Sequence, residues 1–170
     1  MTSILATFAD GRTIAIDDLP PAFYSADPEL RKADMDVFKE VTYGKPILMG
    51  RVTWDTLKRK PLKDRGHHYI YSRTLVGNEG DNISYVSDDF VPPDDAVCIG
   101  GGLLYKKFIP LCDEVYLNMF HFKEPLFFHD KKVTKLYVDD LLCDFDLTGY
   151  DCFSCDSGCI EFLKFSHKKF

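Results

Sequence analysis

Two short apolar runs in this sequence each end in glycine and lead directly into a segment with helical character. Residues 46–49 run into Gly50, and residues 95–99 run into three consecutive glycines at 100–102. A strand that turns at glycine into a helix is the repeating unit of α/β folds, which bind ligands at the carboxyl ends of their strands. This feature predicts a mostly parallel sheet with two turns that face a ligand.

The rest of the chain supplies further elements for the same sheet. We expect strands at residues 3–9, 68–72, 82–86 and 114–120 and helices at 30–41, 53–57 and 103–108. Residues 150–165 have the pattern of two strands joined at residues 156–158, and the proline- and aspartate-rich segments 17–28 and 88–95 have the pattern of loops. We therefore expect one α/β domain spanning residues 1–170. Its central, mostly parallel, twisted sheet would have about eight strands, with an antiparallel C-terminal hairpin and about four flanking helices.

Composition disfavours two classes of function. The chain has 21 Lys plus Arg against 27 Asp plus Glu, a formal net charge of -6, whereas nucleic-acid binding needs clustered basic residues. No apolar stretch approaches the roughly 20 residues that span a bilayer, and the N-terminal residues lack the pattern of a secretory signal. We expect a cytoplasmic protein with no nucleic-acid or membrane partner, whose six cysteines are reduced thiols.

The two glycine turns have the chemistry of a phosphate or dinucleotide site. Glycine has no Cβ, so the backbone at residues 100–102 can approach a ligand closely. At residues 50–53 a helix opens beside Arg51, and the free N–H groups of a helix start attract phosphate. Each turn alone is also explained by ordinary packing, and neither has the GxGxxG pattern. Two such turns in one small domain favour a dinucleotide site.

One acidic residue, Asp34, has apolar neighbours on its predicted helix. Met35 and Phe38 lie at helical spacings of one and four from it. A carboxylate held beside apolar side chains must find partners or remain partly protonated. The alternative is a solvated carboxylate on the polar edge of the helix, which we expect for Asp36.

Taken together, these segments resemble the dihydrofolate reductase family. The matching stretches are ILATFADGRTIA (4–15), KADMDVFKEVTYGKPILMGRVTWDTL (32–57), KPLKDR (60–65), YIYSR (69–73) and CIGGGLLYKKFIPLCDEVYLNMF (98–120). The resemblance implies the single-domain fold of that family and the NADPH-dependent reduction of 7,8-dihydrofolate to 5,6,7,8-tetrahydrofolate. In that reaction a hydride reaches pterin C6 and a proton reaches N5, which supports one-carbon metabolism and thymidylate synthesis. It also implies a monomer that binds antifolate inhibitors.

The resemblance assigns roles on the substrate side. Asp34 would be the single catalytic acid and accept hydrogen bonds from the 2-amino group and N3 of the pterin. Met35 and Phe38 would pack on the substrate rings, and Arg65 would pair with the glutamate α-carboxylate, which suits a guanidinium fork. The substrate residues so implied are Leu5, Ala6, Asp34, Met35, Phe38, Leu62, Arg65, Ile99, Tyr105 and Asn118.

The resemblance also implies NADPH as the cofactor and no metal. Ser72 and Arg73, with Arg51, would surround the adenosine 2′-phosphate, and the peptide bond between Gly100 and Gly101 would be cis. The cofactor residues so implied are Ala6, Thr7, Ile14, Ala15, Gly50, Arg51, Val52, Thr53, Ser72, Arg73, Ile99, Gly100, Gly101, Gly102, Leu103, Leu104 and Tyr105.

Three departures from the family pattern leave other functions open. The tryptophan that the family carries shortly before its acid is missing, since the sole tryptophan is Trp54. Asn118 stands where the family has a threonine that bonds the acid, and the family's GD-x-x-FP segment is not recognisable around residues 122–130. The missing tryptophan leaves open a nucleotide-binding or structural homologue with little catalysis. A related reductase of the riboflavin pathway, whose fold and glycine turns are similar, is the other alternative.

Three cysteines near the C-terminus have a spacing that suggests metal binding. Cys152, Cys155 and Cys159 form a C-x2-C-x3-C pattern, but a structural zinc usually has four Cys or His ligands. We favour strand packing plus a thiol in the turn as the explanation for this pattern.

Overall fold

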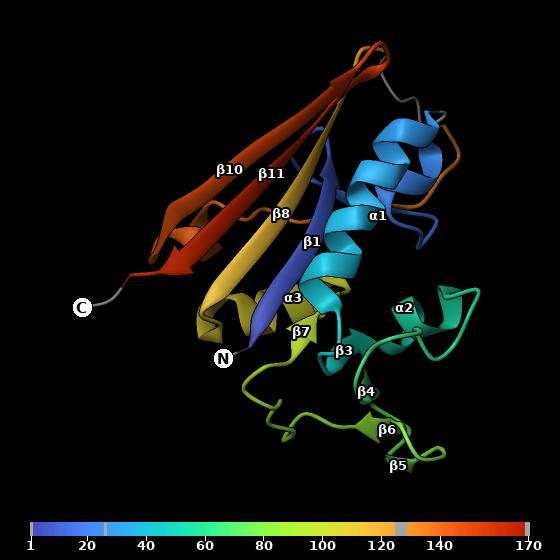
Figure 1. Ribbon diagram of the computed structural model, residues 1–170. Helices are drawn as coiled ribbons and strands as arrows, with labels where there is room; N and C mark the ends of the chain where they lie inside the picture. Colours follow the sequence, from blue (N-terminus) through green and yellow to red (C-terminus); the bar gives the residue numbers. More distant parts are fainter. Residues whose placement is uncertain (1, 26, 125–128, 169–170) are drawn as a thin grey trace.

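The computed structural model describes residues 2–25, 27–124 and 129–168. All strands in these residues belong to one twisted sheet (Figure 1). Along its main path the strands are β10 (Phe145–Cys155), β11 (Gly158–His167), β8 (Glu114–Phe122), β1 (Ser3–Ala9), β7 (Val97–Cys98), β3 (Ile47–Gly50), β4 (His68–Tyr71), β6 (Ile83–Val86) and β5 (Gly77–Asn78). Off this path, β2 (Thr13–Ile16) pairs with β1 and with β9 (Val133–Lys135).

The centre of the sheet is parallel and both of its ends are antiparallel. From β8 through β1, β7, β3 and β4 to β6, every neighbouring pair runs parallel, so crossover connections must join these strands. The hairpin of β10 and β11 extends the β8 end in antiparallel pairing, and β5 extends the β6 end. The predicted fold class, including the C-terminal hairpin, is therefore confirmed.

Helices cover both faces of this sheet. They are α1 (Pro28–Thr42), α2 (Arg51–Thr56), α3 (Gly102–Phe108) and three short 3₁₀ helices, η1 (Pro21–Tyr24), η2 (Ile109–Leu111) and η3 (Asp140–Leu142). In Figure 1, α1 lies along β1 in front of the sheet while α3 lies behind it. No helix in the described ranges is long and apolar enough to cross a membrane.

The numbers of elements differ from the prediction. The described residues form eleven strands and three α-helices, against about eight strands and four helices expected. The strands missed are β2, β5 and β9, which have four, two and three residues. The strands β5 and β9 are too short to show an alternating pattern. Conversely, the strand predicted at residues 95–99 has only two residues, although the Ile99 N–H still donates to the Leu48 carbonyl oxygen at 2.9 Å.

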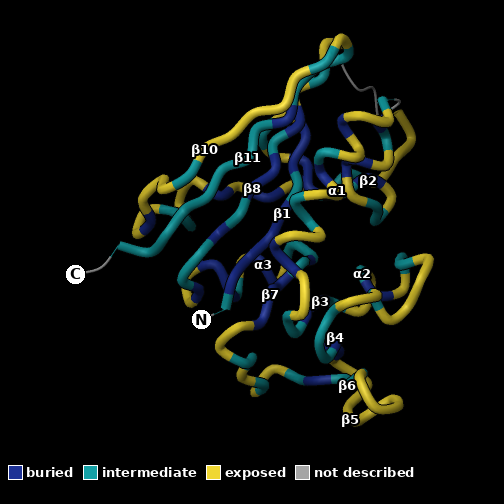
Figure 2. Tube along the Cα trace, in the orientation of Figure 1, coloured by how far each residue is buried: buried dark blue, intermediate teal, exposed yellow. Residues whose placement is uncertain are grey.

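Alternate residues of β1 pack into two different cores. Ile4, Ala6 and Phe8 join the cluster that contains α3 residues, whereas Leu5 joins the cluster that contains Val41 of α1. Successive strand residues point to opposite faces, so the odd-numbered β1 residues after Ser3 face α1. Figure 2 shows the buried central strands and the exposed outer strand β10.

Candidate active site

The Asp34 side chain is buried between α1 and the sheet. It is the seventh residue of the helix, and only 7% of its surface is exposed. Its Oδ1 atom accepts a hydrogen bond of 2.8 Å from Asn118 Nδ2 and one of 3.0 Å from Thr7 Oγ1. Asp34 is thus not the solvated carboxylate of the alternative interpretation, whereas Asp36 is exposed and pairs with Lys32.

The register of two parallel strands brings both donors to this carboxylate. Thr7 of β1 lies directly opposite Asn118 of β8, and opposite residues of neighbouring strands share a face of the sheet. Both side chains therefore point to the face that α1 covers. The sequence suggested Asn118 as a partner of the acid, but it suggested Thr7 only as a cofactor residue, so this contact was missed.

Burial and hydrogen bonding act on the Asp34 carboxyl in opposite directions. Burial raises its pKa, and the hydrogen bonds from Asn118 and Thr7 lower the pKa by a smaller amount. The positive end of a helix dipole acts mainly within the first turn, which Asp34 lies beyond. A buried acid whose pKa is raised is typical of sites where a proton is moved.

The two glycine turns touch at the carboxyl ends of β3 and β7. The Gly50 N–H donates to the Gly100 carbonyl oxygen at 2.7 Å, and the peptide bond between Gly100 and Gly101 is cis, as expected. Gly100 has φ +116°, and a Cβ there would lie 2.9 Å from the Tyr105 hydroxyl oxygen. A Cβ on Gly102 would lie 3.2 Å from Ile14 Cδ1. The turn at residues 100–102 therefore needs glycine at Gly100 and leaves little room for a side chain at Gly102, whereas a Cβ on Gly50 would lie 3.6 Å from its nearest neighbour, an ordinary contact.

Polar residues expected to meet phosphate lie at the starts of helices or loops. Arg51 is the first residue of α2 and is exposed, with Nε 3.6 Å from the Asp55 carboxylate. Ser72 follows β4 and is buried, and its Oγ accepts hydrogen bonds from the N–H groups of Thr74 and Leu75. Arg73 beside it is exposed.

Several residues expected to bind substrate lie in one apolar cluster under α1. Leu5, Phe38, Leu62 and Ile99 all belong to it or pack against it. The Arg65 guanidinium lies over the Phe38 ring at 5.5 Å, and Arg65 Nε donates to Thr42 Oγ1 at 2.7 Å. Met35 does not join a described cluster, and 41% of its surface is exposed.

The remaining residues expected to bind the cofactor lie on the strands β1 and β2 and on the helices α2 and α3. Ala6, Ile14, Leu104 and Tyr105 are buried, and the Tyr105 hydroxyl donates to the Leu5 carbonyl oxygen at 2.9 Å. Ala15 and Thr53 are half-buried. In contrast, Val52 and Leu103 are 57% and 80% exposed in the first turns of α2 and α3. These first turns follow directly from the two glycine turns.

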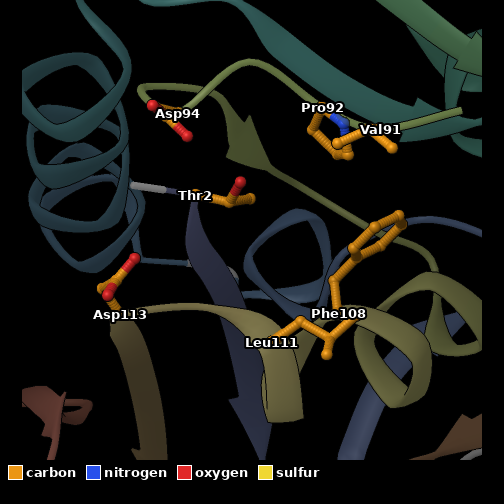
Figure 3. Close-up of a pocket in the computed structure, with 7 residues that line it drawn as sticks. All are labelled: Thr2, Val91, Pro92, Asp94, Phe108, Leu111 and Asp113. Atoms are coloured by element: carbon orange, nitrogen blue, oxygen red, sulfur yellow. The ribbon is translucent and has the colours of Figure 1, made fainter.

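A separate cavity of about 260 Å³ lies at the opposite ends of the strands (Figure 3). It is lined by Thr2, Val91, Pro92, Asp94, Phe108, Leu111 and Asp113. None of these residues was predicted to bind substrate or cofactor, so this cavity is distinct from the candidate site.

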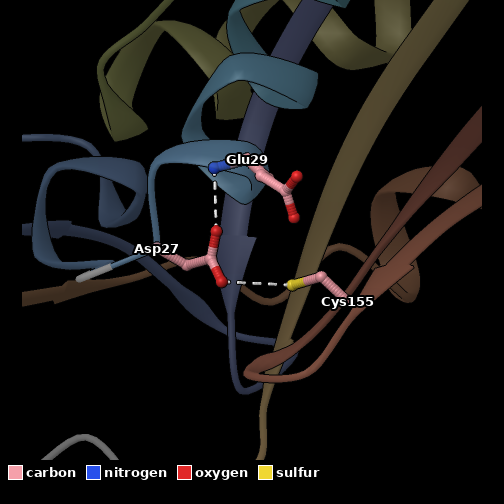
Figure 4. A group of neighbouring side chains, drawn as sticks. All are labelled: Asp27, Glu29 and Cys155. Carbon is pink, nitrogen blue, oxygen red and sulfur yellow. Dashed lines mark hydrogen bonds between the residues drawn. The ribbon is translucent and has the colours of Figure 1, made fainter.

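The three C-terminal cysteines do not converge on one point. Cys152 and Cys155 are three residues apart on β10 and therefore point to opposite faces. Cys155 packs against the cluster that contains Phe120. In the described residues the one close group of metal-ligating type is Asp27, Glu29 and Cys155 (Figure 4). Asp27 there caps α1 and accepts a hydrogen bond from the Glu29 N–H, so packing and capping explain the group.

Comparisons with known proteins agree with this geometry. A family model described as dihydrofolate reductase matches residues 29–128. Dihydrofolate reductase type 3 of Salmonella typhimurium is 33% identical over 122 residues, which are 69% of this chain and 70% of that protein. Dihydrofolate reductase of Haemophilus influenzae is 36% identical over 94 residues, which are 51% of this chain and 55% of that protein. The match thus spans only about half the length of this second relative.

A solved structure has the same fold over almost the whole chain. It is dihydrofolate reductase from Enterococcus faecalis complexed with NADP(H) and RAB-propyl, with a TM-score of 0.75. The alignment covers 99% of this chain and 97% of that chain at 16% sequence identity. The likeness at this identity concerns the fold.

Proposed function

Because this chain belongs to the dihydrofolate reductase family, we propose that it reduces 7,8-dihydrofolate to 5,6,7,8-tetrahydrofolate with NADPH. The observation that carries this proposal is the carboxyl of Asp34, the one buried carboxyl in residues 2–25, 27–124 and 129–168, on the face of the sheet that α1 covers. The riboflavin-pathway alternative lacks comparable support, since the family model and the relatives above are dihydrofolate reductases.

Asp34 binds the pterin and assists its protonation. Its Oδ1 is already occupied by hydrogen bonds from Thr7 and Asn118, so Oδ2 accepts hydrogen bonds from the pterin 2-amino group and N3. Burial raises the pKa of this carboxyl, so the site holds a proton more readily than a solvated aspartate does. Once the pterin is bound, the carboxyl favours protonation of the substrate at N5, and solvent delivers that proton.

Apolar residues and one guanidinium hold the rest of the substrate. Phe38 and Leu62 belong to the apolar cluster under α1 and exclude water from the substrate rings. Arg65 binds the glutamate α-carboxylate with its planar fork of donors. The contacts of Arg65 with Phe38 and Thr42 restrain the guanidinium before substrate arrives, which lowers the entropy lost on binding.

The two glycine turns and nearby basic residues fit a dinucleotide phosphate. The backbone at residues 100–102 has no Cβ to keep a ligand away, and the N–H groups at the start of α2 favour phosphate. Arg51, Arg73 and Ser72 suit the 2′-phosphate that distinguishes NADPH from NADH. When bound, NADPH supplies the hydride, from nicotinamide C4 to pterin C6.

The proposal also includes the oligomeric state and the cellular location of the protein. We expect a cytoplasmic monomer, with residues 1–170 in one domain. It acts on a small-molecule substrate, binds antifolate inhibitors, and has no nucleic-acid or membrane partner.

The proposal is tested by NADPH oxidation with dihydrofolate as the second substrate. Wild-type protein should oxidise NADPH only when dihydrofolate is present. Asp34→Asn keeps the shape of the side chain but removes its charge and its acid, so kcat/KM at neutral pH should fall on the order of 10²-fold or more.

Asp36→Asn is the matched control, because Asp36 lies on the same helix but is exposed and pairs with Lys32. This variant should turn over at the wild-type rate. Folded wild-type protein without turnover, or Asp34→Asn as active as wild type, would contradict the proposal.

A further inference from the structure

We propose that Thr7 is a positioning residue, whose hydroxyl acts with the Asn118 amide to orient the Asp34 carboxyl and stabilise its ionised form. This inference rests on the proposed function, in which Asp34 binds the substrate. It concerns a contact that differs from the expected role of Thr7 beside the cofactor, because the Thr7 hydroxyl bonds the acid itself.

The geometry of the three side chains is set by the sheet. Thr7 and Asn118 are opposite residues of the parallel pair β1 and β8, and both donate to the same oxygen, Asp34 Oδ1, at 3.0 and 2.8 Å. Asn118 is 1% exposed and Asp34 is 7% exposed. Because both strands are held by hydrogen bonds along β1 and β8, the two donors have little freedom to move away.

Two donors on one oxygen decide which carboxyl oxygen carries a proton. The Nδ2 atom of an asparagine amide donates hydrogen bonds and cannot accept one. A proton on Asp34 Oδ1 would therefore face the Asn118 N–H, whereas a proton on Oδ2 leaves both hydrogen bonds intact. Neutral Asp34 thus carries its proton on Oδ2, the oxygen that remains available to the substrate.

In the described residues, no charged group joins Thr7 and Asn118 in stabilising the ionised form of Asp34. The titratable groups of the elements packed around Asp34 are numerous. They are Asp27 at the start of α1; Glu29, Arg31, Lys32, Asp36, Lys39 and Glu40 on α1; Tyr24 on η1; Tyr105, Lys106 and Lys107 on α3; Glu114, Tyr116 and His121 on β8; Asp146, Tyr150, Asp151, Cys152 and Cys155 on β10; and Cys159, Glu161, Lys164 and His167 on β11. Lys32 pairs with Asp36, and Lys164 pairs with Glu114. Tyr105 is buried and neutral, because burial raises its pKa well above the ordinary value. In the described residues, hydrogen bonds from Asn118 and Thr7 are the interactions that oppose the effect of burial.

The test is a pH titration of the Asp34 carboxyl carbon by NMR, in protein labelled with ¹³C at aspartate and without ligand. Asp34→Asn identifies the signal by its absence. Thr7→Val removes the hydroxyl but keeps the β-branched shape that strands favour, and Thr7→Ser keeps the hydroxyl as the matched control.

We expect the ratio of neutral to ionised Asp34 at a fixed pH to rise on the order of tenfold in Thr7→Val, which is the effect of losing one hydrogen bond to the charged form. Thr7→Ser should titrate like wild type. The inference is overturned if Thr7→Val titrates like wild type or at lower pH, or if Thr7→Ser shifts as far as Thr7→Val.

The pH dependence of turnover provides a second, independent measurement. The pH at which kcat/KM for dihydrofolate declines should move upward in Thr7→Val and stay in place in Thr7→Ser. An equal loss of kcat/KM at every pH would mean a merely structural role and overturn the inference. Inactive wild-type protein would contradict the proposed function alone, because the NMR titration needs no turnover.

Discussion

At the scale of single residues, the site depends on one carboxyl group that the fold holds in an unfavourable environment. Asp34 is buried, and two neutral hydrogen-bond donors offset only part of the cost of its charge. The absence of a charged partner among the causes of its pKa shift distinguishes this acid from the exposed pairs elsewhere on α1. An acid in this state binds a proton or a cationic group of a substrate more strongly than water-exposed aspartate does.

This environment predicts that Asp34 lowers the stability of the ligand-free protein. The pKa of Asp34 is raised in the folded state from its ordinary value of 3.8, so its contribution to stability is greatest below that value and is lost as the pH rises through the folded-state pKa. Asp34→Asn does not ionise. At neutral pH this variant should be more stable than wild type by on the order of 1 kcal/mol.

Urea unfolding of both proteins at several pH values measures this effect. The stability difference should shrink as the pH is lowered towards 4, because wild-type Asp34 then becomes protonated as well. A difference that does not depend on pH, or a variant less stable than wild type at neutral pH, would show that burial does not penalise the charge.

At the scale of elements, α1 is the part that brings the acid to the sheet, and its N-terminus is attached to the C-terminal hairpin. The Asp27 carboxylate accepts hydrogen bonds from the N–H groups of Glu29 and Leu30. It also accepts hydrogen bonds from Cys155 Sγ at the end of β10 and from Ser157 Oγ in the turn before β11. One aspartate therefore caps the helix and joins it to a hairpin 128 to 130 residues further along the chain.

The attachment of the helix to the hairpin predicts a ranked series of variants. Asp27→Ala loses the cap and the hairpin contact together, so its Tm should fall by several degrees. Ser157→Ala loses one hairpin contact and keeps the cap, so its Tm should fall by less. Asp36→Ala removes an exposed carboxylate of the same helix and serves as the control with little change.

Thermal unfolding monitored by circular dichroism gives the ranking. These hydrogen bonds also lower the pKa of Asp27, so the effect of Asp27→Ala should be full near neutral pH and diminish as acid protonates the carboxylate. Equal Tm values for Asp27→Ala and Asp36→Ala would mean that the cap contributes nothing measurable.

The sequence contains a signal for the start of this helix that our prediction did not use. Residues 17–28 were predicted to be a loop, but an N-cap aspartate followed by proline at the first helical position is a common helix start, and α1 begins at Pro28 after Asp27. The short helix η1 also lies in that segment. Local capping rules thus explain the difference from the predicted start at residue 30.

At the scale of the whole molecule, the parts that were predictable depend on local sequence, and the parts that were missed depend on pairing between distant segments. The two glycine turns could be predicted from the sequence because a strand, a glycine and a helix follow one another in the chain. The contact of Thr7 with Asp34 depends on the register of β1 with β8, which are more than 100 residues apart. No local pattern specifies that register.

One departure from the family pattern concerns residues that the structure describes only in part. The family's GD-x-x-FP segment was sought around residues 122–130, and residues 125–128 lie outside the described residues.

Titration of methotrexate into the protein in the presence of NADPH, followed by calorimetry, tests the central claim most directly. If Asp34 is the buried acid of a pterin site, one inhibitor should bind per chain. The affinity should drop on the order of 10²-fold in Asp34→Asn, because a buried hydrogen-bonded charge is lost, and remain unchanged in Asp36→Asn. Folded wild-type protein that binds no inhibitor, or equal affinity in wild type and Asp34→Asn, would contradict the claim.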